Sequence, residues 1–380
     1  MHTYLRWAKG KEQEIISFIQ ELVECESPSD SPGDVDRLVD LLVERTRDIA
    51  RAETTSADGF GRHLRLEFQG DGGSRPEGQI LGLGHSDTVW PLGTLDKMPF
   101  RHANGRLWGP GVLDMKSGLA LFIYAARALR ELEVMPRKKI VLLIVSDEEV
   151  GSRTSRAMTE SEAKRSDCVL VLEPGTGLTG KLKTSRKGVG NYRIHVTGKA
   201  VHAGVDFAAG ANAILEAARQ VQKIASFTDL RRGTTVNPGL ISGGTRPNVV
   251  AAEARVVVDV RVVTTRDGEA LDRKMHSLRA VDRRCSIQIE GGLNRPPMER
   301  SKVVKTLFGR AKKLGREIGV KLEETSTGGG SDGNFTAALG IPTLDGLGGV
   351  GEGAHAINES ILVDRIADRT ALLAVLLANL

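Results

Sequence analysis

Three short apolar runs, each followed directly by acidic or imidazole side chains, constrain the fold of this chain most. They are Ile80 to Gly84, Ile140 to Ser146 and Cys168 to Leu172. Between the first two lies a segment whose apolar residues recur at helical spacing, DMKSGLALFIYAARALREL. The order strand, helix, strand predicts an α/β fold in which a sheet of buried parallel strands is flanked by helices.

The size of the chain predicts more than one domain. Its 380 residues exceed the usual single core, and 40% of them are hydrophobic, which is enough to pack two. Helical spacing before the first strand predicts helices at Lys11 to Glu24 and at Val35 to Ile49. We therefore expect a helix-flanked catalytic domain that begins near the N-terminus.

A second module begins at about Thr184, where the pattern changes. An alternating stretch (NYRIHVTG) is followed by a helical one (NAILEAARQVQKI), two strands, a helix at 267 to 280 and a last strand (CSIQIEGG). This βαββαβ order is the ferredoxin-like split motif. From about Val303 long helices return, so we expect catalytic segments at 1–183 and 297–380 around an inserted lid or dimerisation domain at 184–296.

The cysteines and the chain ends favour a cytoplasmic protein. Cys25, Cys168 and Cys285 are far apart and form no CxxC pair, which argues against iron–sulfur, disulfide and zinc-finger sites. The N-terminus lacks a charged-then-apolar secretory pattern, and the apolar tail ALLAVLLANL is too short to span a bilayer. We expect no membrane partner.

The basic charge balance does not indicate a nucleic-acid partner. The net charge is +5 and the pI is near 9.1, but basic residues are scattered, as at Arg231–Arg232 and Arg283–Arg284. Aromatic residues make up only 4% of the chain, so they cannot alternate with a basic stripe. A small anionic substrate is compatible with this charge.

Several residues at strand ends and in glycine-rich loops could carry chemistry. Each has an ordinary interpretation: a polar strand end, a helix N-cap at Asp114, a solvated acidic turn, or a surface histidine. Together they supply two imidazoles and several carboxylates to one domain, which are ligands of zinc-like ions. The set is His85, Asp87, Asp114, Glu148, Glu149, Glu173 and His355.

Two ions at such a site need a shared carboxylate, a role that suits Asp114. Asp87 lies two residues after His85 and could steady its ring. Glu148 and Glu149 point to different sides of an extended chain, so one can bind metal while the other takes a proton from water.

The order and spacing of these residues resemble the dizinc M20 metallopeptidases, which include glutamate carboxypeptidase, acetylornithine deacetylase and succinyl-diaminopimelate desuccinylase. The motifs are HSD at 85–87, GPGVLDMKSG around Asp114, Glu148–Glu149, Glu173–Pro174 and His355. The resemblance covers nearly the whole chain, including the inserted module.

The resemblance implies a role for each residue. His85 and Glu173 would bind one Zn²⁺ (or Co²⁺ or Mn²⁺), Glu149 and His355 would bind the second, and Asp114 would bridge them. Glu148 would be the general base, and the Asp114–Met115 peptide bond would be cis.

The resemblance also implies substrate contacts and a homodimer. His202, in GKAVHAG, would cross a dimer interface formed by the inserted domain and polarise the scissile carbonyl. The substrate contacts would be Asn248, Arg261, Lys181 and Arg295, with Gly329 and Gly330 in the loop TGGGSD. We expect KGVGNYRIHVTG to form the outer strand of that domain, whose free edge pairs with its copy.

The predicted function is metal-dependent hydrolysis of an amide next to a free carboxylate. The substrate would be a small peptide or N-acyl amino acid, and the released C-terminal residue would be glutamate-like, because Lys181, Arg261 and Arg295 are basic. The alternative is an N-acyl-amino-acid deacylase of the acetylornithine type. A non-catalytic protein of the same fold is disfavoured because every expected ligand and Glu148 are present.

Overall fold

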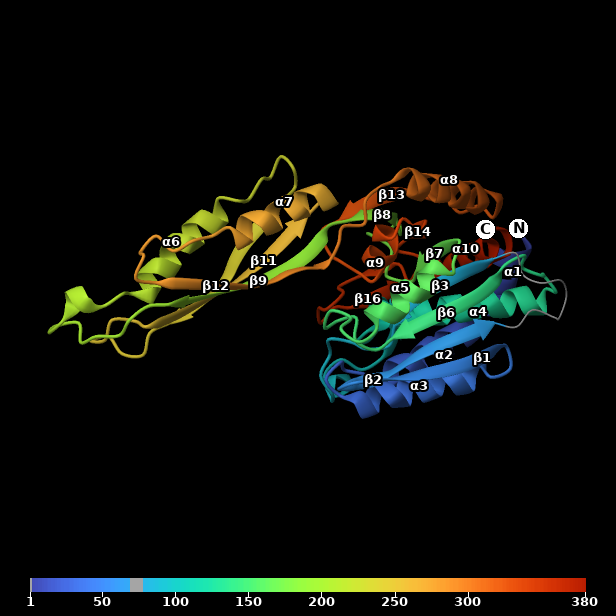
Figure 1. The fold of residues 1–380 in the computed structure, drawn as a ribbon. Coiled ribbons are helices and arrows are strands. Elements are labelled where there is room, and N and C mark those ends of the chain that lie inside the picture. The colour runs from blue at the N-terminus through green and yellow to red at the C-terminus, as the bar shows by residue number, and fades with distance from the viewer. Residues whose placement is uncertain (1, 69–77) are drawn as a thin grey trace. The chain divides into compact units, whose positions relative to one another are not determined.

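The computed structural model describes residues 2–68 and 78–380, which form two compact units (Figure 1). The first comprises Met1–Ser185, Arg300–Ser326 and Ser331–Leu380; the second comprises Arg186–Glu299 and Thr327–Gly330. The predicted fold class is confirmed: a mixed sheet flanked by helices carries an inserted βαββαβ module.

A six-stranded mixed sheet is the framework of the first unit. Its order is β1 (Ala50–Ala57), β2 (Phe60–Phe68), β6 (Lys139–Val145), β3 (Gln79–His85), β7 (Cys168–Val171) and β14 (Thr343–Leu344). The strands from β6 to β14 are parallel to one another, whereas β2 pairs antiparallel with both β1 and β6. The three predicted parallel strands are confirmed; β1 and β2 are additional to the prediction.

Helices cover both faces of this sheet (Figure 1). They are α1 (Thr3–Gly10), α2 (Glu12–Glu24), α3 (Pro32–Thr46), α4 (Ser117–Glu131), α5 (Arg156–Lys164), α8 (Lys302–Glu317), α9 (Gly333–Ala338) and α10 (Ile366–Asn379). Because successive strand residues face opposite sides, Ile80 packs in the core that contains α2, α4 and α10, while Leu81 and Leu83 pack in the core that contains α5.

Two glycines in β3 let α4 approach the sheet closely. A Cβ at Gly82 would lie 2.6 Å from the Phe122 ring, and one at Gly84 would lie 2.7 Å from Leu119. Any larger residue would push α4 outward. The segment that leads into α4, η2 (Val112–Lys116), is therefore fixed beside the end of β3.

Smaller elements complete the first unit. One four-stranded sheet has the order β15 (Gly351–Glu352), β16 (Ser360–Leu362), β5 (Arg106–Trp108) and β4 (Arg101–Ala103). Strands β8 (Leu182–Arg186) and β13 (Glu324–Thr327) form a two-stranded sheet, and short 3₁₀ turns occur at η1 (Thr94–Asp96) and η4 (Val363–Arg365).

The second unit has the predicted ferredoxin-like order. Its elements are β9 (Gly188–Thr197), η3 (Phe207–Ala209), α6 (Ala213–Ala225), β10 (Thr235–Gly243), β11 (Glu253–Val262), α7 (Thr265–His276) and β12 (Ser286–Arg295). The sheet order is β10-β11-β9-β12, so the prediction that β9 is the outer strand is wrong. In a split βαββαβ motif the first strand pairs with the third and the fourth, which leaves β10 and β12 at the edges.

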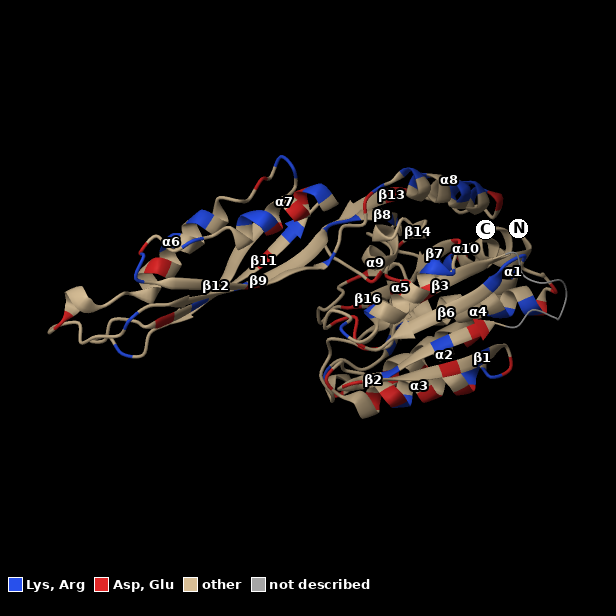
Figure 2. Cartoon of the chain, in the orientation of Figure 1, with Lys and Arg blue, Asp and Glu red and all other residues tan. Residues whose placement is uncertain are grey.

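Charges of both signs lie on α3 and α7, whereas Lys and Arg predominate on α8 (Figure 2). Among residues 2–68 and 78–380, none of the helices combines the length and apolar character needed to cross a bilayer.

Candidate metal centre

Five of the predicted ligands lie at one edge of the main sheet. His85 ends β3, Glu149 follows β6, and Glu173 follows β7. Because these strands are parallel neighbours, their carboxyl ends bring the three side chains together. Asp114 comes from η2, and His355 comes from the loop between β15 and β16.

Asp114 lies between the two histidines. Its Oδ1 is 3.3 Å from Nε2 of His85, and its Oδ2 is 3.3 Å from Nε2 of His355. Nε2 of His85 is also 3.8 Å from Oε1 of Glu173, and Nε2 of His355 is 3.1 Å from Oε1 of Glu149. The side chains therefore form two groups of one imidazole and one carboxylate, joined by the two oxygens of Asp114.

These donors fit a pair of divalent cations. Nε2 of His85 and Oδ1 of Asp114 are buried and make no hydrogen bond within the described residues. Potential ligand atoms of His85, Asp114 and Glu149 lie within 4.8 Å of one another, as do those of His85, Glu148 and Glu173. Imidazole nitrogen with carboxylate oxygen is the ligand set of catalytic zinc.

The protein alone places strong opposite charges here. Hydrogen bonding to Asp114 and Glu149 raises the pKa of His355 to about 10. Burial lowers the pKa of His85, but contacts with Asp114 and Asp87 outweigh this and raise it well above its usual value. Burial likewise opposes ionisation of Asp114, but the two histidines lower its pKa. Without cations, protons on the two imidazoles offset part of the negative charge of the carboxylates.

Asp114 does not act as the N-cap of α4. The helix begins at Ser117, and the cap position is Lys116. The Asp114–Met115 peptide bond is cis, as the resemblance implies. The carboxylate of Asp114 faces His85 and His355 rather than the first turn of the helix.

The backbone of Asp87 orients the ring of His85. Nδ1 of His85 donates to the carbonyl oxygen of Asp87 at 2.8 Å, whereas the Asp87 carboxylate lies 3.5 Å away. This contact leaves Nε2 facing Asp114 and Glu173. The predicted contact between Asp87 and His85 is thus made mainly by the carbonyl group.

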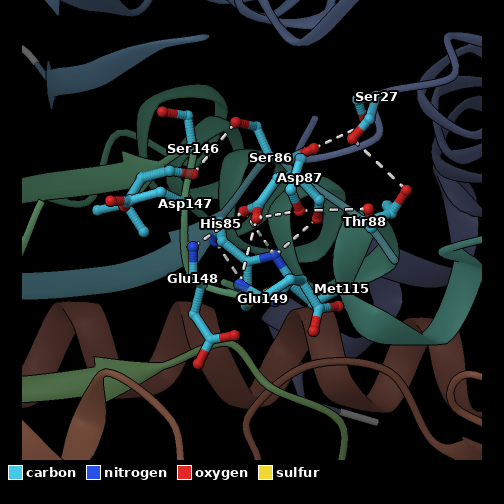
Figure 3. Close-up of polar contacts among 12 residues, drawn as sticks. Ser27, His85, Ser86, Asp87, Thr88, Met115, Ser146, Asp147, Glu148 and Glu149 are labelled. Atoms are coloured by element: carbon cyan, nitrogen blue, oxygen red, sulfur yellow. Dashed lines mark hydrogen bonds and ion pairs between the residues drawn. The ribbon is translucent and has the colours of Figure 1, made fainter. Parts of the chain in front are cut away.

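The carboxylate of Asp87 instead holds the two glutamates (Figure 3). Its Oδ1 accepts the N–H of Glu148 and its Oδ2 accepts the N–H of Glu149, each at 3.2 Å. Oδ2 also accepts from Oγ of Ser29 at 2.7 Å. Asp87 is therefore linked to the expected base and to a predicted ligand through their backbone.

Two further contacts of this region were not anticipated from sequence. Asp147 accepts hydrogen bonds from Thr154 and Ser155, which closes the turn after the glutamate pair. Glu359 accepts hydrogen bonds from backbone N–H groups around Asp114. The only sequence signal for Glu359 is its position four residues after His355.

The predicted substrate contacts of the second unit form two separate groups. His202 and Asn248 are adjacent, because residues 202 and 249 form an isolated bridge and Ala203 N–H donates to the Asn248 carbonyl at 2.9 Å. Both residues are exposed.

Arg261 and Arg295 belong to the other group, around the glycine segment 328–330. Arg261 contacts the carbonyl of Gly328 at 3.4 Å, and a Cβ at Gly330 would lie 3.0 Å from Arg295. Arg186 donates to the carbonyls of Gly329 and Gly330. Lys181, in the first unit, pairs with Glu323 at 3.1 Å.

Comparisons with known proteins identify relatives of this chain. The sequence profile of Peptidase family M20/M25/M40 matches residues 82–379. Carboxypeptidase G2 of Pseudomonas sp. is 28% identical over 92% of this chain and 85% of its own length. Succinyl-diaminopimelate desuccinylase of Bordetella petrii is 28% identical over 91% of this chain and 92% of its own length. The crystal structure of aminopeptidase PepT from Bacillus cereus superposes with a TM-score of 0.77 at 22% identity, covering 97% of this chain and 98% of that one.

Proposed function

Because the chain belongs to Peptidase family M20/M25/M40, and is therefore a metal-dependent hydrolase of amide bonds, we propose that it removes a C-terminal amino acid from a small peptide or N-acyl amino acid. The released residue is glutamate-like. The metal centre holds two ions, with Zn²⁺ as the first candidate and Co²⁺ or Mn²⁺ as substitutes. One observation carries the proposal: Asp114 lies 3.3 Å from each of two histidines that also contact Glu173 and Glu149.

In this proposal His85 and Glu173 hold one ion, His355 and Glu149 hold the other, and Asp114 serves both. When bound, the ions lower the pKa of water and polarise the amide carbonyl. Glu148 is the general base. It takes a proton from the attacking water and returns it to the leaving amine, and Asp87 fixes its backbone for that transfer.

The arginines of the second unit explain the proposed preference for an acidic product. Arg261 pairs with the carboxylate of Asp259 at 3.0 Å and contacts the carbonyl of Gly328, and Arg295 lies beside Gly330. Such groups bind carboxylates in a bidentate manner, and N–H groups of Gly329 and Gly330 can approach the same ligand. Lys181 of the first unit, which pairs with Glu323, remains a predicted substrate contact.

We also propose a homodimer formed by the inserted unit. Strand β10 is an edge strand, and Leu240 and Ile241 on it are 68% and 58% exposed. Leu215 on the neighbouring helix α6 is 54% exposed. In the dimer, His202 of the partner subunit donates to the scissile carbonyl, and Asn248 acts beside it.

The three free cysteines suit the reducing cytoplasm, where we place the enzyme.

An N-acyl-amino-acid deacylase of the acetylornithine type is the second candidate. It is favoured by the desuccinylase relative, which matches this chain at the same identity as the carboxypeptidase. The two activities attack the same kind of amide, but they differ in which side of the bond is recognised. A carboxypeptidase selects the released residue, whereas a deacylase selects a short acyl group.

A panel of substrates separates the two. Zinc-loaded protein is incubated with N-benzoyl-glutamate, a dipeptide ending in glutamate, N-acetylornithine and N-succinyl-diaminopimelate, and the released amino acid is identified by mass. The proposal expects glutamate release with the highest kcat/KM. Faster turnover of the acetyl or succinyl substrate would favour the deacylase, and no turnover of any would count against both.

The role of Glu148 is tested by Glu148→Gln. We expect kcat to fall by about 10²-fold to 10⁴-fold because the proton acceptor is lost. The content of bound zinc should stay the same, since the ligands remain. Glu160→Gln, an exchange on α5 at a residue that pairs with Arg156, is the control and should keep full activity. An unchanged rate in Glu148→Gln would exclude Glu148 as the general base.

A further inference from the structure

Glu359 is a buried carboxylate whose two oxygens accept four N–H groups. Oε1 accepts from the backbone N–H of Leu113 at 2.9 Å and from that of Asp114 at 3.0 Å. Oε2 accepts from the backbone N–H of Gly111 at 3.0 Å and from Nε1 of Trp90 at 2.8 Å. All three backbone donors come from the segment that carries Asp114.

The same residue is joined to the loop of His355. The N–H of Glu359 donates to the carbonyl of Ala356 at 2.9 Å, and the N–H of Ala356 donates to the carbonyl of Gly353 at 2.8 Å. These bonds form a compact turn with His355 inside it. Glu359 therefore connects two segments that are 245 residues apart and that each supply a predicted ligand.

We propose that Glu359 is a positioning residue that sets the distance between Asp114 and His355, and thereby the affinity for the second cation. Its two oxygens face N–H groups. It acts through the backbone: by holding three N–H groups of residues 111–114 it fixes where the Asp114 carboxylate points. This inference rests on the two-ion site proposed above.

A carboxylate is the side chain that this cluster requires. Each oxygen faces two donors, so both oxygens must act only as acceptors. A glutamine has nearly the same shape, but its NH₂ group would face two N–H groups in place of accepting from them. An aspartate is shorter by one methylene and cannot reach both ends of the segment from the same backbone position.

The test is Glu359→Gln, with Glu352→Gln as the matched control. Glu352 lies seven residues earlier, is exposed, and pairs with Arg106 instead of the Asp114 segment. Zinc dissociation constants are measured by competition with a chromophoric chelator, and the visible absorption spectrum of the Co²⁺-loaded protein is recorded. We expect Glu359→Gln to weaken binding of the second ion about 10-fold to 100-fold and to change the cobalt spectrum. Glu352→Gln should match the wild type.

A second variant covers the case in which Glu359→Gln does not fold. Trp90→Phe removes one of the four donors but keeps every backbone contact. It should therefore weaken binding of the second ion as well, but by a smaller factor. The melting temperature of the metal-free proteins separates positioning from general destabilisation, since a loss of affinity at an unchanged apo melting temperature indicates positioning.

Two failures can be told apart. If the wild type binds no divalent ion, the proposed metal centre itself is wrong. If the wild type binds two ions and both variants bind them with the same affinity and the same cobalt spectrum, the metal centre stands and the role of Glu359 is refuted.

Discussion

The carboxylate of Asp87 binds the backbone of two consecutive residues whose proposed roles differ. It accepts the N–H groups of Glu148 and Glu149 with separate oxygens, and Ser29 donates to it as well. With both N–H groups held, the two glutamate side chains leave the chain in defined directions. A small rotation of this turn would move the base relative to the ligands, and geometric errors of this kind reduce catalysis strongly.

Asp87→Asn should therefore impair turnover more than metal binding. One oxygen becomes an NH₂ group that cannot accept the N–H of Glu148 or Glu149. We expect kcat/KM to fall about 10-fold to 100-fold while zinc content at saturation stays near that of the wild type. Steady-state kinetics measure kcat/KM, and metal analysis measures the zinc content. Asp364→Asn, at an exposed residue, is the control. Activity within twofold of the wild type would contradict the role.

The two histidines predict that metal affinity depends on pH. Hydrogen bonding to Asp114 raises the pKa of His355 to about 10, and that of His85 is also raised, so both rings carry a proton at neutral pH when no cation is bound. A cation must displace each proton from Nε2. Raising the pH removes the competing proton, so affinity rises with pH up to about pH 10 for the ion at His355.

We expect the dissociation constant of each ion to fall by up to about tenfold per pH unit for each protonated ring between pH 6.5 and 8.5. Calorimetry in buffers of different ionisation enthalpy should detect proton release on zinc binding. His355→Gln should lower the number of protons released, whereas His276→Gln, a change on α7 in the second unit, should not. Affinity that is independent of pH would show that the rings are not protonated in the apo protein.

Three of the proposed ligands could be expected to lie together because they share a recognisable local pattern. His85, Glu149 and Glu173 follow apolar strands, and parallel strands collect such residues at one edge. Glu359 and Ser29 could not be predicted in this way. Their side chains accept or donate hydrogen bonds across the fold, and a carboxylate that binds distant backbone N–H groups leaves no local periodicity in the sequence.

At the scale of elements, α10 holds the backbone before β15 through the buried guanidinium of Arg369. Arg369 donates to the carbonyls of Gly348 at 3.0 Å and Gly180 at 3.2 Å, and also to the carbonyl of Gly346. Burial lowers the pKa of Arg369 to about 10, so the guanidinium still carries its charge at neutral pH. Gly346 and Gly348 lie shortly before the loop of His355, whereas Gly180 lies just before β8.

Arg369→Met should destabilise the first unit without adding bulk. The methionine fills part of the space, but three carbonyl groups lose their donor in a buried environment. We expect the free energy of unfolding to fall by about 3 kcal/mol or more, because hydrogen bonds to charged groups are worth about 1.5–3 kcal/mol each. Urea denaturation measures this, and the exposed Arg316→Met on α8 should change stability by less than about 0.5 kcal/mol. Equal stability of both variants would refute the role.

Element order was easier to predict than strand neighbours. The six elements of the inserted unit follow from their alternating and helical patterns, but β9 alternates in the same way whether it is central or at an edge. Its place between β11 and β12 is decided by long-range pairing. Strand β1 was missed because ARAETTSA has few apolar residues to reveal it, and β2 was missed because charged residues interrupt its apolar ones in FGRHLRLEF.

At the scale of the whole molecule, the inserted unit separates its predicted substrate contacts. Asn248 precedes β11, beside His202, whereas Arg261 lies near the other end of β11. Eight residues of strand span roughly 26 Å. A substrate of the proposed size cannot reach both groups in the same copy of the second unit. If both groups act on one substrate, His202 and Asn248 must come from another copy of the chain, which is a physical reason for the proposed homodimer.

Ile241→Glu tests this arrangement. Edge strands pair with their copies through free backbone groups and apolar side chains, and a carboxylate placed opposite its symmetry mate in a two-fold interface repels it. We expect light scattering after size exclusion to show a monomer, with kcat reduced about 10²-fold or more, since a donor to the developing oxyanion is worth that much. Leu230→Glu, at a residue 76% exposed in the loop after α6, should stay dimeric and active.

Mixing two inactive proteins extends the test. His202→Ala lacks the donor and Glu148→Gln lacks the base, but a mixed dimer pairs one intact catalytic unit with one intact His202. Half of the dimers formed from equal amounts are mixed, and each has one complete site, so about one quarter of wild-type activity should return if subunits exchange freely. The Ile241→Glu change in both proteins should abolish that recovery. Recovery with no dependence on Ile241 would place the interface elsewhere, and a fully active monomer would show that each chain completes its own site.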